Sequence, residues 1–225
     1  MKLKKIASLA LAGIMAVSML AGCKDGTNQE EPSSSSQVPA TTNVVTYAND
    51  ALTGAQKGVF TFKSSSELDT ILQAAANDKD KFASKDIKTV YGNTNSVYDK
   101  NNNELKSVYN TVEDKISANS IVITSTQDLK TAAPNGKDQK MVRVLAISGA
   151  LDEKTAITKL VDDFTNDYKL DSIFPAEIAG TPGYDCDYTA EISAVKVSSV
   201  DNAANTAWVV AIVITQSVTE AANVQ

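Results

Sequence analysis

The fold of this 225-residue chain is decided by the stretch Ala207-Trp208-Val209-Val210-Ala211-Ile212-Val213-Ile214-Thr215. Its β-branched and aromatic residues favour an extended strand. Successive side chains of a strand point to opposite faces, so one face carries Trp208, Val210, Ile212 and Ile214. The other face carries Val209, Ala211 and Val213. Because both faces are apolar, we expect a central strand, extending to Val218.

Three more long runs of β-branched and apolar residues predict the rest of the sheet. Tyr188 to Val200 precedes the central strand, and the polar segment Asp201 to Asn205 separates the two. Ile121 to Thr126 and Met141 to Ser148 form a second pair. Between them lies Ala133-Pro134-Asn135-Gly136, with proline and glycine at the positions that a type I turn prefers.

Three segments show apolar residues at helical spacing. The first is opened by Ser64 and Glu67, which have the spacing of a capping box, and Val59 to Phe62 before it is a short strand candidate. The second follows the asparagines 101–103, and the third begins near Asp152. The apolar stripes are Leu68, Ile71, Leu72 and Ala75; Leu105, Val108, Tyr109, Val112 and Ile116; and Ile157, Leu160, Val161, Phe164 and Tyr168. Each stripe is one-sided, so each helix packs one face and exposes the other.

These elements predict an α+β fold of two layers, with an antiparallel sheet and amphipathic helices packed on one face. Residues 44–225 are long enough for one globular domain with a real core. The order helix-strand-strand occurs twice, which leaves an internal duplication open. The alternative is that any two amphipathic helices share this spacing, since few residue identities match.

The first residues of the chain have the layout of an export signal. Lys2, Lys4 and Lys5 precede an apolar stretch from Ile6 to Leu20, and small residues follow. The apolar stretch is shorter than the roughly 20 residues that a membrane span needs.

The tetrapeptide Leu20-Ala21-Gly22-Cys23 that closes this segment resembles the lipobox of bacterial lipoproteins. The resemblance implies that residues 1–22 are cleaved and that Cys23 carries a diacylglyceryl lipid on the extracytoplasmic face of the cell membrane. The alternative is an ordinary secretory signal with a chance cysteine. Residues 23–43, rich in serine and proline, are then the lipidated cysteine and a disordered tether. The resemblance ends there, and no family is recognised for residues 44–225.

Charge and composition exclude several functions. Without Lys2, Lys4 and Lys5, the chain has 18 basic and 27 acidic residues, a formal charge of −9. Such a surface repels nucleic acids and anionic lipid headgroups, so a lipid would have to provide membrane attachment. The chain has no histidine, which excludes Ser-His-Asp catalysis and imidazole zinc sites within it. If Cys23 is lipidated, Cys186 has no cysteine partner in the chain, and we expect it to be a small structural side chain with a raised pKa beside Asp185 and Asp187.

Two motifs are weak. Residues 99–103 have oxygen ligands at the spacing of a calcium loop, but Glu104 stands where glycine is required, so a turn before a helix is the better interpretation. Ser193-Ala194-Val195-Lys196 matches the S-x-x-K of serine β-lactamases, yet it lies in a predicted strand rather than at a helix start. Asp162 and Asp163 read as a solvated helix face, and Trp208 as a core residue.

One loop is a candidate ligand site. It surrounds Gly180 to Tyr184 and carries the residues Glu177, Tyr184, Asp185, Cys186, Asp187 and Tyr188. An acidic, tyrosine-bearing loop could bind a sugar or a cation, and a plain turn is the alternative. No catalytic residue, metal site or cofactor is predicted. We therefore expect a non-enzymatic binding or structural module of the cell envelope, with an envelope protein or a small molecule as partner. A solute-binding receptor and a carboxylate-based envelope hydrolase are the alternatives.

Overall fold

The computed structural model describes residues 43–118, 122–123, 129, 138–167, 173–180 and 182–221. The predicted signal, the lipobox with Cys23 and nearly all of the tether lie outside these residues. So do the predicted turn at 133–136, Tyr168 and most of the strand predicted at 121–126.

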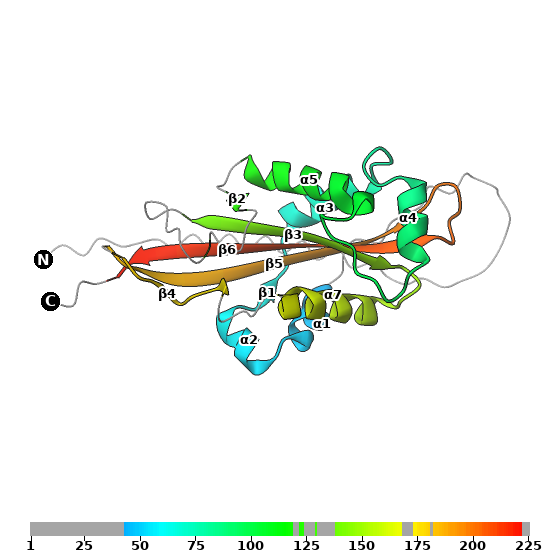
Figure 1. The fold of residues 1–225 in the computed structure, drawn as a ribbon. Helices are drawn as coiled ribbons and strands as arrows, with labels where there is room; N and C mark the ends of the chain where they lie inside the picture. Colours follow the sequence, from blue (N-terminus) through cyan, green and yellow to red (C-terminus); the bar gives the residue numbers. More distant parts are fainter. Residues whose placement is uncertain are drawn as a thin grey trace, which may run out of the picture. The chain divides into compact units, whose positions relative to one another are not determined.

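Six strands form one mixed sheet (Figure 1). They are β1 (Phe62–Lys63), β2 (Val122–Ile123), β3 (Gln139–Ser148), β4 (Glu177–Ile178), β5 (Tyr184–Ser198) and β6 (Thr206–Glu220). The order across the sheet is β1-β5-β6-β3-β2, and β4 pairs with β5 off this path. The apolar stretch that begins at Ala207 is therefore the central strand, as predicted.

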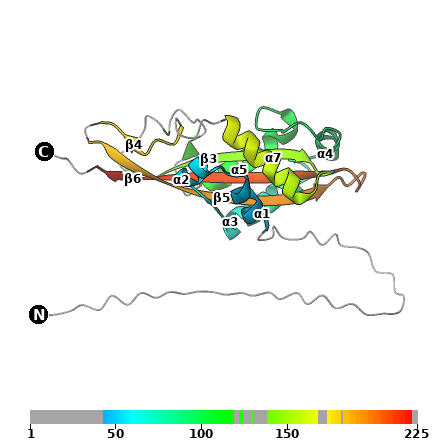
Figure 2. The same cartoon turned by 90° about the horizontal axis from the view of Figure 1, so that it is seen from below.

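Helices pack on both faces of the sheet (Figures 1 and 2). They are α1 (Asn43–Ala51), α2 (Gly54–Val59), α3 (Ser66–Asn77), α4 (Ser84–Tyr91), α5 (Asn103–Ser117) and α7 (Glu153–Asp167). One core joins α1 and α7 to the face of β6 that carries Val210, Ile212 and Ile214. The second core joins α3, α4 and α5 to the face that carries Val209, Ala211 and Val213.

The predicted α+β class is confirmed, but the placement of all helices on one face is wrong. The reason lies in β6 itself, because two apolar faces both need helices to keep them from water. The wholly antiparallel sheet is also wrong. β1 runs parallel to β5 and β2 runs parallel to β3, so the strand pair predicted around 121–148 is no hairpin.

The structure does not support the helix-strand-strand duplication. α5 and α7 lie on opposite faces of the sheet (Figure 1). The strand pairs that follow them differ as well, since β2 and β3 are parallel while β5 and β6 are antiparallel. The two segments therefore share a spacing of apolar residues and no common geometry.

The first segment of the domain closes one edge of the sheet. Sequence periodicity missed α1, α2 and α4, which are helices of 9, 6 and 8 residues, too short to give a clear pattern. The side-chain amide of Asn49 in α1 brackets the backbone of Phe62 in β1. Asn49 Nδ2 donates to the Phe62 carbonyl at 3.0 Å, and the Phe62 N–H donates to Asn49 Oδ1 at 2.8 Å. These two bonds reproduce the pair that another strand would make.

The longest structural unit is the hairpin of β5 and β6, with 15 residues in each strand. Its connection begins where the Ser199 N–H donates to the Asn205 carbonyl at 2.9 Å. Beside it, Gly149 follows β3, and its N–H donates to the Thr206 carbonyl at 2.8 Å. A Cβ atom on Gly149 would lie 2.6 Å from the carbonyl carbon of Thr206, which leaves no room for a side chain.

We expect Gly149→Ala to lower the free energy of unfolding by about 1–3 kcal/mol, because the new methyl group must push apart two strand ends. Gly58→Ala is the matched control, since a Cβ there meets nothing within 4 Å. That variant should be neutral or stabilised by about 0.4–1 kcal/mol. Urea denaturation of both variants measures the difference, and equal stability would contradict the close approach at Gly149.

Candidate functional site

The candidate loop is the connection of a short hairpin at one end of the sheet. β4 pairs antiparallel with the start of β5, and the register sets Glu177 opposite Asp185 and Ile178 opposite Tyr184. The Cys186 N–H donates to the Ala176 carbonyl at 2.7 Å, which continues the pairing beyond β4. The candidate residues after Gly183 therefore lie on a strand, and strand geometry decides where their side chains point.

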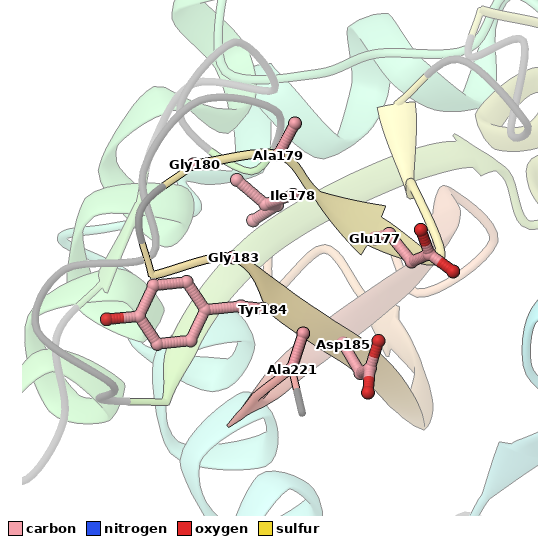
Figure 3. Close-up of a pocket in the computed structure, with 8 residues that line it drawn as sticks. All are labelled: Glu177, Ile178, Ala179, Gly180, Gly183, Tyr184, Asp185 and Ala221. Carbon is pink, nitrogen blue, oxygen red and sulfur yellow. The ribbon is translucent and has the colours of Figure 1, made fainter. Parts of the chain in front are cut away.

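Strand alternation separates the six predicted site residues into two sets. Asp185 and Asp187 point to one face of β5, and Glu177 shares that face because it lies directly opposite Asp185. Tyr184, Cys186 and Tyr188 point to the other face. In Figure 3 the carboxylates of Glu177 and Asp185 lie together, while the Tyr184 ring extends in a different direction. Of the six residues predicted as a ligand site, Glu177, Tyr184 and Asp185 line one hollow, and Cys186, Asp187 and Tyr188 do not.

A hollow of about 350 Å³, partly open to solvent, lies at this hairpin (Figure 3). Its lining consists of Glu177, Ile178, Ala179, Gly180, Gly183, Tyr184, Asp185 and Ala221. Gly183 and Gly180 contribute only backbone, and Ala221 N–H already donates to the Gly183 carbonyl at 2.9 Å. The hollow can admit a small polar group. The two acidic side chains in its lining, Glu177 and Asp185, are both exposed, so neither is in the buried setting that raises the pKa of a general acid.

The other face of β5 holds a buried polar network centred on Gln216 of β6. Gln216 lies opposite Tyr188 in the ladder and is fully buried. Its Nε2 donates to the Tyr188 hydroxyl at 2.9 Å and to the Leu129 carbonyl at 3.0 Å, and lies 3.7 Å from Cys186 Sγ. The Tyr188 hydroxyl in turn donates to the Pro175 carbonyl at 2.8 Å. The network therefore ties β5 and β6 to the main chain at Leu129 and Pro175.

A row of aromatic rings from Phe174, Phe60 and Phe62 packs beside Tyr188 of this network. Phe174 packs edge-on against Tyr188 with ring centroids 5.2 Å apart, and against Phe60 at 5.7 Å. Phe60 also contacts Phe62 of β1 edge-on at 5.5 Å. Such edge-to-face pairs stabilise a core beyond their buried area. The chain of rings makes the Tyr188 side of β5 part of the core rather than a ligand surface.

Burial governs the ionisation of Cys186 and Tyr188. Burial raises the pKa of the Cys186 thiol above its ordinary value of 9.0, and the charges of Asp185 and Asp187 raise it further. Burial likewise raises the pKa of Tyr188 far above its ordinary value of 10.0, against the hydrogen bond from Gln216. Both groups are neutral at physiological pH. Cys186 is buried and its pKa is raised, as expected, although burial rather than the charge of the neighbouring aspartates is the main cause.

The remaining sequence candidates have structural roles. Asp99 Oδ1 accepts from the Asn101 N–H at 2.8 Å, which makes residues 99–103 the predicted turn before α5. Ser193 is a buried residue inside β5, so it does not stand at a helix start. Trp208 is half-buried against the α7 core, its indole N–H donates to the Leu151 carbonyl at 3.1 Å, and Lys196 Nζ lies 5.3 Å from its ring centroid.

Sequence reasoning missed Gln216, Phe174 and Pro175. Gln216 carried a usable signal, because it is a polar residue within the apolar alternation of the central strand. Phe174 and Pro175 gave none, since they are placed by tertiary contacts with Tyr188.

Among the described residues, no three acidic or cysteine side chains are grouped closely enough to hold a metal ion. None of the helices in this part of the chain has the length and apolar character needed to cross a bilayer. No protein-family model, curated protein or solved structure matches this chain.

The like-charged pair of Glu177 and Asp185 should weaken the fold. Directly opposed like charges on antiparallel strands are destabilising by about 0.2–1 kcal/mol. We therefore expect Asp185→Asn or Glu177→Gln to raise the free energy of unfolding at low salt, and the double variant to add little to either single one. Urea denaturation at low and high salt measures this, and the gain should shrink as salt screens the charges. A loss of stability in both single variants would contradict the opposed pairing.

The buried thiol predicts a loss of stability in alkali. The pKa of Cys186 is raised in the folded state, so the stabilising contribution is fully present below pH 9.0 and is lost as pH rises through the folded pKa. Cys186→Ala should flatten this decline, and Tyr188→Phe should flatten the part at still higher pH. Thermal unfolding across alkaline pH measures the effect. An identical pH profile in Cys186→Ala would show that the thiol ionises equally in both states.

Proposed function

We propose that the protein is a lipid-anchored, extracytoplasmic binding module without catalytic activity. The observation that carries this proposal is the separation of the candidate residues by strand alternation. The three carboxylates of Glu177, Asp185 and Asp187 lie on the opposite face of β5 from Tyr184, Cys186 and Tyr188. Acid–base or nucleophilic catalysis needs such groups to converge on one reacting atom. What the hairpin offers instead is an exposed polar surface, which suits binding.

The attachment rests on the sequence at the start of the chain. The tetrapeptide ending in Cys23 is similar to a lipobox, and the tether that follows reaches α1 at Asn43. A flexible segment of 20 residues spans roughly 25 Å root-mean-square, at about 5–6 Å times the square root of its length. The domain would thus be held close to the outer face of the membrane.

Two alternatives are weaker. An envelope hydrolase needs one carboxyl group that stays protonated at neutral pH, which burial normally provides. Glu177 and Asp185 are both exposed. A solute receptor of the common type closes two lobes around a cleft. The described residues build two cores on the opposite faces of one sheet, which gives no such pair of lobes.

Membrane attachment is tested with Cys23→Ala in the full chain. We expect the variant to leave the membrane fraction, because a signal without its lipid-bearing thiol cannot be anchored. Cys186→Ala is the matched control, since it removes the other cysteine and should stay attached. Fractionation of cells followed by detection of the protein gives the result. Retention of Cys23→Ala in the membrane fraction would rule out lipid anchoring.

A further inference from the structure

We propose that the exposed end of the β4-β5-β6 sheet docks an extended cationic polypeptide segment, a partner class that deepens, and rests on, the proposed binding function. The surface, here called the acidic sheet face, consists of Glu177, Asp185, Asp187, Thr189, Ser217 and Thr219. These side chains come from three neighbouring strands and share one face of the sheet.

The register arranges the acidic sheet face in rows across the strands. Glu177, Asp185 and Thr219 form the outermost row. Asp187 and Ser217 form the next, and Thr189 with Thr215 the third. On β4, β5 and β6 each of these positions presents either a carboxylate or a hydroxyl group, and the carboxylates occupy the side nearest β4, while Lys140 of β3 continues the third row.

Among the described residues, no helix packs on the side chains of this end of the face. Glu177, Asp185, Asp187, Thr189 and Thr219 are all exposed. The helices α3, α4 and α5 pack on the same face farther along the strands, where the side chains of β6 become apolar from Val213 onward. The opposite face of this end is occupied by the Gln216 network and Phe174. The acidic sheet face is thus an open surface on a rigid support.

The negative charge of this face selects a cationic partner. Glu177 and Asp185 stand directly opposite each other, so the free protein bears a repulsion that a bound cation would relieve. Carboxylates on an open surface also repel anionic polymers, and they repel a second copy of the same face. Two basic residues bound the acidic area: Lys140 of β3 lies opposite Thr215, and Lys63 of β1 lies opposite Glu191 of β5.

The spacing fits an extended chain. Asp185 and Asp187 are two residues apart on β5, a separation of about 7 Å. Alternate side chains of an extended peptide have the same period, so successive lysine or arginine residues on one side of such a peptide can meet both carboxylates. The serine and threonine hydroxyl groups between them can donate to peptide carbonyl groups and accept from peptide N–H groups.

Docking is tested with the full chain in a neutral detergent and a fluorescently labelled oligolysine peptide as the probe. Fluorescence anisotropy at physiological ionic strength, where the Debye length is about 8 Å, measures the affinity. We expect the unchanged protein to bind the peptide and the double variant D185N/D187N to lose roughly tenfold in affinity. A peptide of the same length with acetylated lysines should not bind.

A matched variant separates docking from general attraction to an acidic protein. D50N/D201N removes the same charge from two exposed aspartates, one in α1 and one in the connection at the far end of the β5-β6 hairpin. It should bind the peptide like the unchanged protein. Equal losses in the two double variants, or no binding by the unchanged protein, would overturn the proposal. Both outcomes are independent of the Cys23→Ala result, so failure of docking and failure of anchoring are distinguishable.

Discussion

The fold depends on one constraint, which is that the central strand β6 is apolar on both faces. Each face needs apolar partners, and no single helix layer can supply both. The chain meets this requirement by dividing its amphipathic helices between the two sides, with α7 and α1 on one and α3, α4 and α5 on the other. The long register of β6 with β3 and β5 then holds the two cores on a common sheet. The end of the sheet formed by β4 and the start of β5 lies beyond the part of the strands that α3, α4 and α5 cover, so its side chains on that face are polar and exposed.

Much of this architecture could be predicted from local pattern. The alternation in 207–218 identified the central strand, and the spacing of Leu105, Val108 and Val112 identified α5. Strand direction could not be predicted, because β1 and β2 are two-residue strands whose pairing is set by tertiary contacts. The side on which each helix packs was equally inaccessible, since an apolar stripe shows that a helix has a buried face but not which sheet face it meets.

The candidate site shows the same limit at the level of single residues. Composition pointed to a segment with carboxylates and tyrosines, but the prediction treated it as a loop in which neighbours in sequence are neighbours in space. Because Tyr184 to Tyr188 is a strand, adjacent residues face opposite ways, and Cys186 shares its environment with Gln216 rather than with Asp185 and Asp187. Gln216 belongs to this environment through a pairing thirty residues along the chain, a separation that no local pattern reports.

The two hydrogen bonds between the Asn49 side chain and the Phe62 main chain also affect how copies of the protein associate with one another. An uncovered strand edge invites the edge of a neighbouring molecule, and such addition is the first step of sheet growth between molecules. Here the side-chain amide of Asn49 forms hydrogen bonds with both the N–H and the carbonyl group of Phe62. Proteins confined to a surface meet one another far more often than proteins free in solution. For the membrane-anchored domain proposed above, this protection of Phe62 would make pairing between the β1 edges of colliding molecules less favourable.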